Sequence, residues 1–348
     1  MKILFRLHRK RGWAVVVLAT LTGCYAMHSG SGETLLPETG APTSPPPADS
    51  EAARGKTAML FVTSRDANAI LGFPSTAKGN VPPSVDITGD KTGLSEPIAL
   101  GVDPASGKIY AANDQGSTIL IFPKGANGNV APQTLGGSKV PIQETDGVAI
   151  DSHGEIYVSD YKANAIYVFA AGANGNTAPI RTIAGTKTLL NEPVGMSFDS
   201  KGNLYVANPY NFRLPIEEFT KGADGNVAPI VVIRGKQTKI VHDFGNVSVD
   251  KHDRIVVACE DSILVFALGA NGNVKPQTII EGAATKINNA YSLGTDADSN
   301  IYAADINFKK DISSILVFAA KAKGNEAPVR VLAGSRTGIN DAHYPEFY

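Results

Sequence analysis

A phrase of the form Gly-Asn-x-x-Pro occurs six times along this chain. Its copies begin at Gly79, Gly128, Gly175, Gly225, Gly272 and Gly324, so that successive copies lie 49, 47, 50, 47 and 52 residues apart. A period of this length, built from short strand-like runs and turn residues, is typical of a β-propeller, in which each repeat forms one four-stranded blade. The 348 residues would by themselves suit one large domain or two smaller ones, and the repeat favours one.

Residues 193–233 show how one repeat maps onto a blade. The expected elements are an inner strand (193–198), a tight turn (199–202), a second strand (204–207), a third strand (216–219) and an outer strand (230–233). The turn begins with Asp199 and ends with Gly202, which are residues that favour tight turns. The phrase around Gly225 and Asn226 forms the hairpin between the third and outer strands. Pro229 begins the edge strand, where no N–H is needed.

The strand count predicts how the ring closes. The chain supplies six second, six third and six outer strands, but five clear inner strands. The domain begins at a second strand (59–63) and ends just after an outer strand (329–332), with the tail 344–348 left over. We therefore expect a six-bladed all-β propeller in which this tail supplies the inner strand of the first blade and removes the exposed sheet edges.

The N-terminus has the pattern of a bacterial export signal. Basic residues are followed by an apolar run from Trp13 to Leu21, which is too short for a membrane-spanning helix. The segment Leu21-Thr22-Gly23-Cys24 resembles the bacterial lipobox, so residues 1–24 are expected to be a signal peptide and Cys24 the lipidated residue. Tyr25 rather than Asp follows Cys24, and by the enterobacterial sorting rule this implies the outer membrane. An ordinary signal peptide that contains a Cys is the alternative.

Residues 25–55 are rich in Pro, Ser and Thr and poor in large apolar residues. Such a segment cannot bury enough surface to fold, so we expect a disordered tether that holds the domain (56–348) away from the membrane. The one Cys of that domain, Cys259, lies in the apolar run 255–259 and is expected to be a buried thiol outside any disulfide.

Charge limits the classes of partner. Five of the 32 Lys and Arg residues lie in the first eleven positions; without them 27 basic side chains face 33 acidic ones. A mildly acidic domain without a basic run argues against nucleic acid and against adhesion of the domain itself to anionic lipid. The expected partners are the membrane, through the N-terminal lipid only, and an unidentified envelope protein or small ligand. We expect a monomer.

The strand sequences carry a family resemblance. Residues 202–208, Gly-Asn-Leu-Tyr-Val-Ala-Asn, and residues 166–169, Ile-Tyr-Val-Phe, resemble NHL-type repeats of the TolB-like six-bladed propellers. The resemblance covers residues 57–348 and implies the fold. It does not imply one activity, because this group includes ligand-binding platforms, protein-interaction domains and a few enzymes.

In propellers the loops that enter the inner strands and leave the second strands surround one mouth of the central channel. The candidate ligand-binding residues there are Asp146, Asp160, Asn208, Tyr210, Arg213 and His242. Tyr210 and Arg213 belong to an unusual loop between Pro209 and Pro215. Carboxylates and amides around a mouth could hold Ca²⁺ or another divalent cation, although no cofactor is required. Because an Asp or Asn also closes the second strand at positions 113, 160, 208 and 305, a structural capping role is the favoured interpretation of those four.

An enzymatic alternative comes from two further resemblances. Residues 146–151, Asp-Gly-Val-Ala-Ile-Asp, resemble a segment of the gluconolactonase and regucalcin family whose first Asp binds the catalytic metal. That family also needs an Asn at the equivalent position of another blade, and the other blades have Ile98, Val194, Gly245 and Tyr291 there. Virginiamycin B lyase, a repeat propeller with a metal and a His base, is matched no better, because the histidines are scattered. A non-enzymatic binding platform is the preferred prediction, and a cation-dependent hydrolase or lyase is the alternative.

Overall fold

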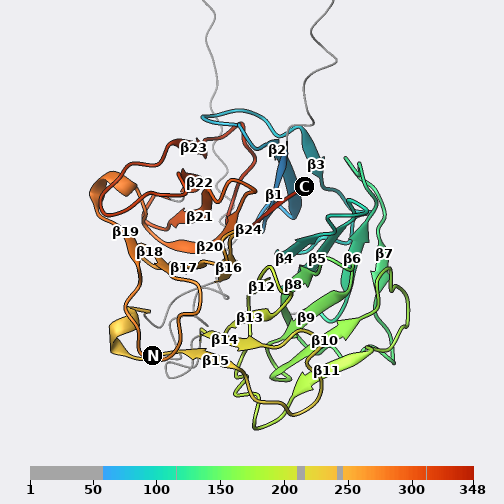
Figure 1. Ribbon diagram of the computed structural model, residues 1–348. Helices are drawn as coiled ribbons and strands as arrows, with labels where there is room; N and C mark the ends of the chain where they lie inside the picture. Colours follow the sequence, from blue (N-terminus) through green and yellow to red (C-terminus); the bar gives the residue numbers. More distant parts are fainter. Residues whose placement is uncertain (1–57, 115, 210–215, 241–245, 311) are drawn as a thin grey trace, which may run out of the picture. The chain divides into compact units, whose positions relative to one another are not determined.

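The computed structural model describes residues 58–348 except 115, 210–215, 241–245 and 311. These residues form six antiparallel four-stranded sheets arranged in a ring (Figure 1). This is the six-bladed β-propeller that the repeat predicts.

The strands follow one another from the inside of each blade to its outside. Blade 1 contains β24 (Ala342–Phe347), β1 (Met59–Ser64), β2 (Ala69–Pro74) and β3 (Val85–Ile87). Blade 2 contains β4 (Pro97–Val102), β5 (Ile109–Asn113), β6 (Ile119–Phe122) and β7 (Gln133–Leu135). Blade 3 contains β8 (Thr145–Ile150), β9 (Ile156–Asp160), β10 (Ala165–Phe169) and β11 (Arg181–Ala184).

The second half of the ring repeats this order. Blade 4 contains β12 (Met196–Phe198), β13 (Leu204–Ala207), β14 (Ile216–Phe219) and β15 (Val231–Ile233). Blade 5 contains β16 (Val247–Val249), β17 (Ile255–Cys259), β18 (Ser262–Phe266) and β19 (Thr278–Glu281). Blade 6 contains β20 (Ala290–Thr295), β21 (Ile301–Asn307), β22 (Ile312–Phe318) and β23 (Arg330–Ala333). Two short 3-10 turns, η1 (Lys236–Thr238) and η2 (Ala283–Thr285), follow β15 and β19, and no described helix is long and apolar enough to cross a membrane.

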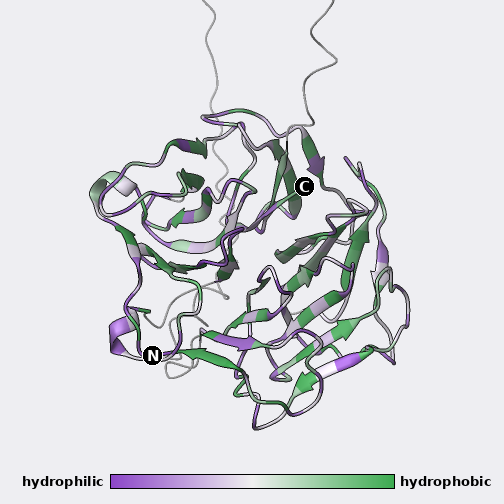
Figure 2. Ribbon diagram, in the orientation of Figure 1, coloured by the Kyte–Doolittle hydropathy of each residue, from purple (hydrophilic) through white to green (hydrophobic). Residues whose placement is uncertain are grey.

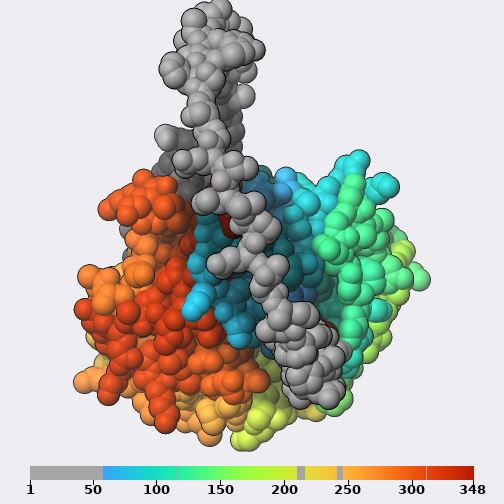
Figure 3. All heavy atoms as spheres, turned by 90° about the horizontal axis from the view of Figure 1, so that it is seen from above, coloured from blue at the N-terminus to red at the C-terminus, as the bar shows by residue number. Residues whose placement is uncertain are grey.

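The last strand closes the ring, as the strand count predicts. β24 pairs antiparallel with β1, with Phe347 opposite Leu60 and His343 opposite Thr63. Figure 3 shows the consequence, since the blue N-terminal strands and the red C-terminal strands lie side by side. Strand β24 begins at Ala342, two residues before the tail expected from the sequence.

The core lies between the blades. Hydrophobic residues predominate in most strands, and many of the connections are hydrophilic (Figure 2). Near the end of each third strand a phenylalanine is almost completely buried in the apolar cluster shared with the preceding blade. Phe219, for example, packs with Tyr157 and Ile166 of blade 3. Burying one such ring contributes roughly 1.5–3 kcal/mol relative to leaving it in water. The six are Phe73, Phe122, Phe169, Phe219, Phe266 and Phe318.

The repeated phrase joins neighbouring blades. The Gly225 N–H donates to the Thr182 carbonyl at 2.7 Å, and the Asn226 Oδ1 accepts from the Lys187 N–H at 2.7 Å, so the loop of blade 4 is held on blade 3. Gly185, at φ 117°, allows this approach, because a Cβ there would lie 2.6 Å from the Asn226 Cγ. The same Asn bond recurs at Asn80, Asn129, Asn176, Asn273 and Asn325.

Candidate functional site

One end of the ring carries both sets of connections in which the candidate residues lie. Since the strands of each blade alternate in direction, the loops between second and third strands lie at the same end as the segments that enter the inner strands. We call this end the mouth face. The opposite end, which carries the turns after the inner strands, we call the turn face.

In four blades an Asp or Asn at the end of the second strand caps the segment that enters the inner strand. The Asp160 carboxylate accepts backbone N–H groups from Gln143 at 2.6 Å, Ala163 at 2.9 Å and Lys162 at 3.1 Å. Asp305, Asn113 and Asn208 accept in the same way from Asn288 (2.7 Å), Ser95 (2.9 Å) and Asn191 (3.2 Å). These bonds account for the recurrence of the four residues by folding. A ligand-binding role for Asp160 and Asn208 stays a prediction.

Asp146 lies in β8 and is buried at the mouth face. Its backbone carbonyl accepts a 2.7 Å hydrogen bond from the Tyr344 hydroxyl of β24, which belongs to blade 1. The Tyr344 N–H donates to the Ser292 Oγ of blade 6 at 2.8 Å. Tyr344 therefore connects the inner strands of blades 1, 3 and 6.

The other predicted mouth residues, Tyr210, Arg213 and His242, lie outside the described residues. The structure places Asp146 and Asp160 in blade 3 and Asn208 just after β13 in blade 4. The described part of the predicted site thus spans two neighbouring blades.

A histidine that the sequence analysis did not place at the mouth lies there. His343 of β24 occupies in blade 1 the position that Asp146 occupies in blade 3, because Ala342 and Thr145 pair with equivalent residues of the second strands. The expectation that His242 is the histidine of the mouth is therefore incomplete. Counting the repeat position into the C-terminal tail could have found His343.

His343 lies at one end of a series of contacts between charged side chains. Its Nε2 lies 3.2 Å from the Asp341 Oδ1, and the Asp341 Oδ2 lies 3.3 Å from Arg65. Arg65 also contacts Asp114 at 3.1 Å and pairs with Glu96 of blade 2. Burial alone would raise the pKa of Asp341, but the hydrogen bond and charge of His343 and the charge of Arg65 outweigh it and lower that pKa.

Glu217 departs from the repeat in the core of blade 4. The equivalent residues of the other third strands are Leu71, Leu120, Tyr167, Leu264 and Leu316. Glu217 is fully buried, and neither of its carboxyl oxygens has a hydrogen-bond partner among the described residues. Burial raises its pKa well above the usual value. The sequence analysis did not single out this residue, although a carboxylate at a Leu position of the repeat was a visible signal.

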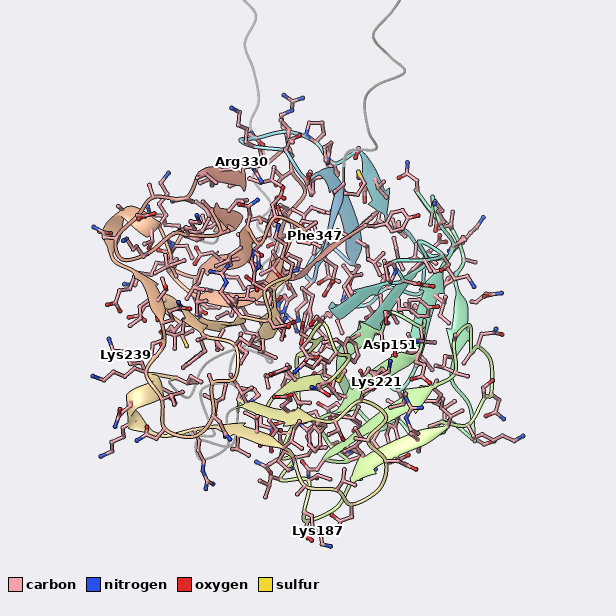
Figure 4. All side chains as sticks on the ribbon, viewed as in Figure 1. Asp151, Lys187, Lys221, Lys239, Arg330 and Phe347 are labelled. Carbon is pink, nitrogen blue, oxygen red and sulfur yellow. The ribbon has the colours of Figure 1, made fainter. Side chains whose placement is uncertain are left out.

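Glu346 departs from the repeat in the innermost strand of blade 1. The equivalent residues are Gly101, Ala149, Ser197, Ser248 and Gly294, all of them small. Burial raises the pKa of Glu346 to about 8. Its neighbour in the strand, Phe347, lies toward the inside of the ring in Figure 4.

Charge is segregated on the mouth face. Acidic side chains outnumber basic ones in the described loops near the channel, and an outer rim carries exposed cations, of which Lys187 and Lys239 point outward in Figure 4. Among the described residues no group of three His, Cys, Asp or Glu side chains could hold a metal ion. The inner acids are Asp66, Glu96, Asp114, Glu144, Glu192, Glu260, Asp261 and Asp341, beside the cations Arg65, Lys162, Lys309 and Lys310; the rim cations are Lys91, Lys139, Lys187, Lys239, Lys286 and Arg336.

Comparison with known proteins supports the fold. No family model matches the chain, and no curated protein matches it. Among solved structures, a chain of the nidogen/laminin complex superposes with a TM-score of 0.57 at 14% identity, covering 83% of this chain and 98% of its own length. Virginiamycin B lyase from Staphylococcus aureus gives a TM-score of 0.45 at 13% identity, with 69% and 75% covered. At these identities the first likeness shows the propeller fold and nothing about activity, and the second is too distant to use.

Proposed function

We propose that this protein is a lipid-anchored propeller of the bacterial envelope that binds a macromolecular partner on its mouth face and is not an enzyme. In this proposal Cys24 carries the lipid, residues 25–55 form the tether, and the outer membrane is the site of attachment. The NHL-type, TolB-like resemblance of the strand sequences supports the same assignment.

The observation that supports this proposal is that most polar side chains at the mouth cap loops or form ion pairs within the protein. Asp160, Asp305, Asn113 and Asn208 cap loops, and Asp341 and Asp114 pair with Arg65. The inner carboxylates of Glu260 and Asp261 are exposed and form a charged surface. Such a surface suits a partner with cationic side chains, since complementary charge steers association and sets specificity.

The alternative is a divalent-cation-dependent hydrolase or lyase. It would use Asp146 as a metal ligand and a histidine as the base, and the discovery of His343 at the mouth supplies such a histidine. Against it, the described residues offer no three-ligand group, and the Nε2 of His343 is directed to Asp341.

Metal analysis separates the two functions. The protein is purified without chelator and its divalent metal content is measured beside those of Asp146→Asn and Asp146→Ala. We expect less than stoichiometric metal in all three proteins. One bound metal per chain that is lost in both folded variants would overturn the proposal in favour of the enzyme.

A further inference from the structure

The second and third strands of blade 6, β21 and β22, remain paired over a greater length than the second and third strands of the other blades. Asp305 is the capping residue equivalent to Asp160, but in blade 6 the pairing continues past it through Ile306–Ser313 and Asn307–Ile312. Two further residues per strand lengthen the hairpin by roughly 6–7 Å. Its β21 and β22 have seven residues each, whereas the second and third strands of the other blades have four to six.

Hydrogen bonds hold the end of this hairpin. The Lys310 N–H donates to both the carbonyl and the Oδ1 of Asn307, each at 3.1 Å. The Asn307 Nδ2 donates to the Asn288 Oδ1 at 2.8 Å, which ties the hairpin to the segment entering β20. Residues 307–310 are thus held by hydrogen bonds at the mouth face.

The tip presents apolar side chains that the repeat does not explain. Phe308 is 55% exposed and Ile312 is 47% exposed. Three of the other large apolar residues that are exposed among the described ones, Ile180, Ile230 and Val329, follow the proline of the repeated phrase in separate blades. In the β21–β22 hairpin, by contrast, two lie four residues apart. The sequence between them is Lys309, Lys310 and Asp311, and both lysines are exposed.

We propose that this tip inserts into the surface of a lipid bilayer with anionic headgroups. An aromatic and an aliphatic side chain beside lysines suit the boundary between headgroups and acyl chains. A standard protein interface buries about 800 Å² per partner with matching shape, whereas a bilayer needs no matching shape. This modifies the sequence-based expectation that the domain itself does not adhere to anionic lipid.

The proposal rests on the anchoring at Cys24 proposed above. Between Cys24 and β1 lie residues 25–58, which can span at most roughly 110 Å when fully extended. The tip can therefore reach the membrane that holds the lipid. The tip and the lipid would attach the domain at two points and limit how the mouth face is presented.

A tryptophan reporter tests the contact. Trp13 is the single Trp of the chain, so full-length Phe308→Trp, after subtraction of the parent emission, reports on the tip. Leu268→Trp is the matched control, because Leu268 is 61% exposed in the loop that follows β18 on the turn face. With phosphatidylcholine–phosphatidylglycerol vesicles we expect the emission of Trp at 308 to shift to the blue and to be quenched by lipids brominated on the acyl chains. The control should stay unshifted and unquenched.

Emission from position 308 that stays water-like, or equal quenching at both positions, would overturn the proposal. The paired change Lys309→Gln and Lys310→Gln should weaken binding to anionic vesicles by about tenfold, as expected for lysines at a charged membrane surface. An unchanged affinity, or equal insertion into pure phosphatidylcholine, would contradict the role of anionic headgroups. Because the vesicle assay does not require processing at Cys24, its failure would leave the proposed anchoring and the mouth function standing.

Discussion

At the residue scale, residues that recur in every repeat stabilise the fold. Residues that differ from the repeat are the candidates for a functional role. The asparagine of the repeated phrase was predicted to lie in a hairpin within its own blade. The structure adds that its side chain bonds to the preceding blade, through a pair about forty positions apart that local sequence patterns do not reveal.

Replacing Asn226 should therefore weaken the joint between blades 3 and 4. Asn226→Ala removes the acceptor of the Lys187 N–H and should lower the free energy of unfolding by about 1 kcal/mol. Chemical denaturation measures the change. The control is Asn174→Ala, whose side chain bonds only to the nearby Gly172 carbonyl in the equivalent loop of blade 3 and should change stability by less than half as much. Equal losses in the two variants would argue against the inter-blade role.

Replacing Glu217 should stabilise the protein. Glu217→Leu places at this position the residue found in four other blades and removes two buried oxygens that lack partners among the described residues. Burial of an unpaired polar group costs roughly 1–3 kcal/mol, so the free energy of unfolding at neutral pH should rise by about that amount. Glu217→Gln keeps the shape and a polar group, so its gain in the free energy of unfolding should be smaller than that of Glu217→Leu. A loss of stability in the Leu variant would show that the carboxyl has a partner or a role that the described residues do not reveal.

At the element scale, β24 is the strand on which the ring and the site both depend. It completes blade 1, brings His343 and Tyr344 to the mouth face and positions Asp341 beside Arg65. The strand count predicted this closure. It could not predict the side-chain contacts, because they join residues separated by most of the chain.

Removing Arg65 should loosen this closure. Arg65→Met leaves the partly buried carboxylates of Asp341 and Asp114 without their cation and should lower the free energy of unfolding by about 2 kcal/mol. Lys162→Met, at an exposed position of the mouth face, is the control and should change stability little. Thermal unfolding of the two variants at low salt measures the difference. A loss no larger in Arg65→Met than in the control would contradict a closing role for this cluster.

At the scale of the whole molecule, carboxyls with shifted pKa values set the pH dependence of stability. The pKa values of Glu217 and Glu346 are raised by burial, that of Glu346 to about 8, so their contribution is complete below the usual Glu pKa and is lost as the pH rises through the folded value. The pKa of Asp341, beside His343 and Arg65, is lowered, and so is that of Glu155, because it accepts a hydrogen bond from Arg181. Both carboxyls stabilise the protein above their usual pKa values and lose that contribution as the pH falls. We therefore expect maximal stability near pH 5, with a decline from there to about pH 8, the folded pKa of Glu346.

Denaturation curves across this range test the expectation. In Glu346→Gln the loss of stability with rising pH should be smaller than in the parent protein, because glutamine does not ionise. A parent protein equally stable at mildly acidic and mildly alkaline pH would contradict the assignment of these raised pKa values.

The molecule as a whole was more predictable than its site. The repeat period, the order of strands within each repeat and the strand count predicted the number of blades and the closure of the ring by the tail. These features could be predicted because they are periodic along the sequence. The features that the sequence analysis missed lie where the chain departs from the repeat, at His343, Glu217 and the long β21–β22 hairpin. The surroundings of these residues could not be predicted, because they depend on contacts between segments far apart in the sequence.

Site-specific cross-linking tests the central claim that the mouth face binds a partner. A photoreactive amino acid is placed at Ser117, an exposed residue of the mouth face in blade 2, and as a control at Ser200, an exposed residue of the turn face in blade 4. After irradiation of intact cells, we predict a discrete adduct of one mass from Ser117 and none from Ser200. The absence of an adduct at Ser117, or the same adduct from both positions, would contradict a partner-binding mouth face.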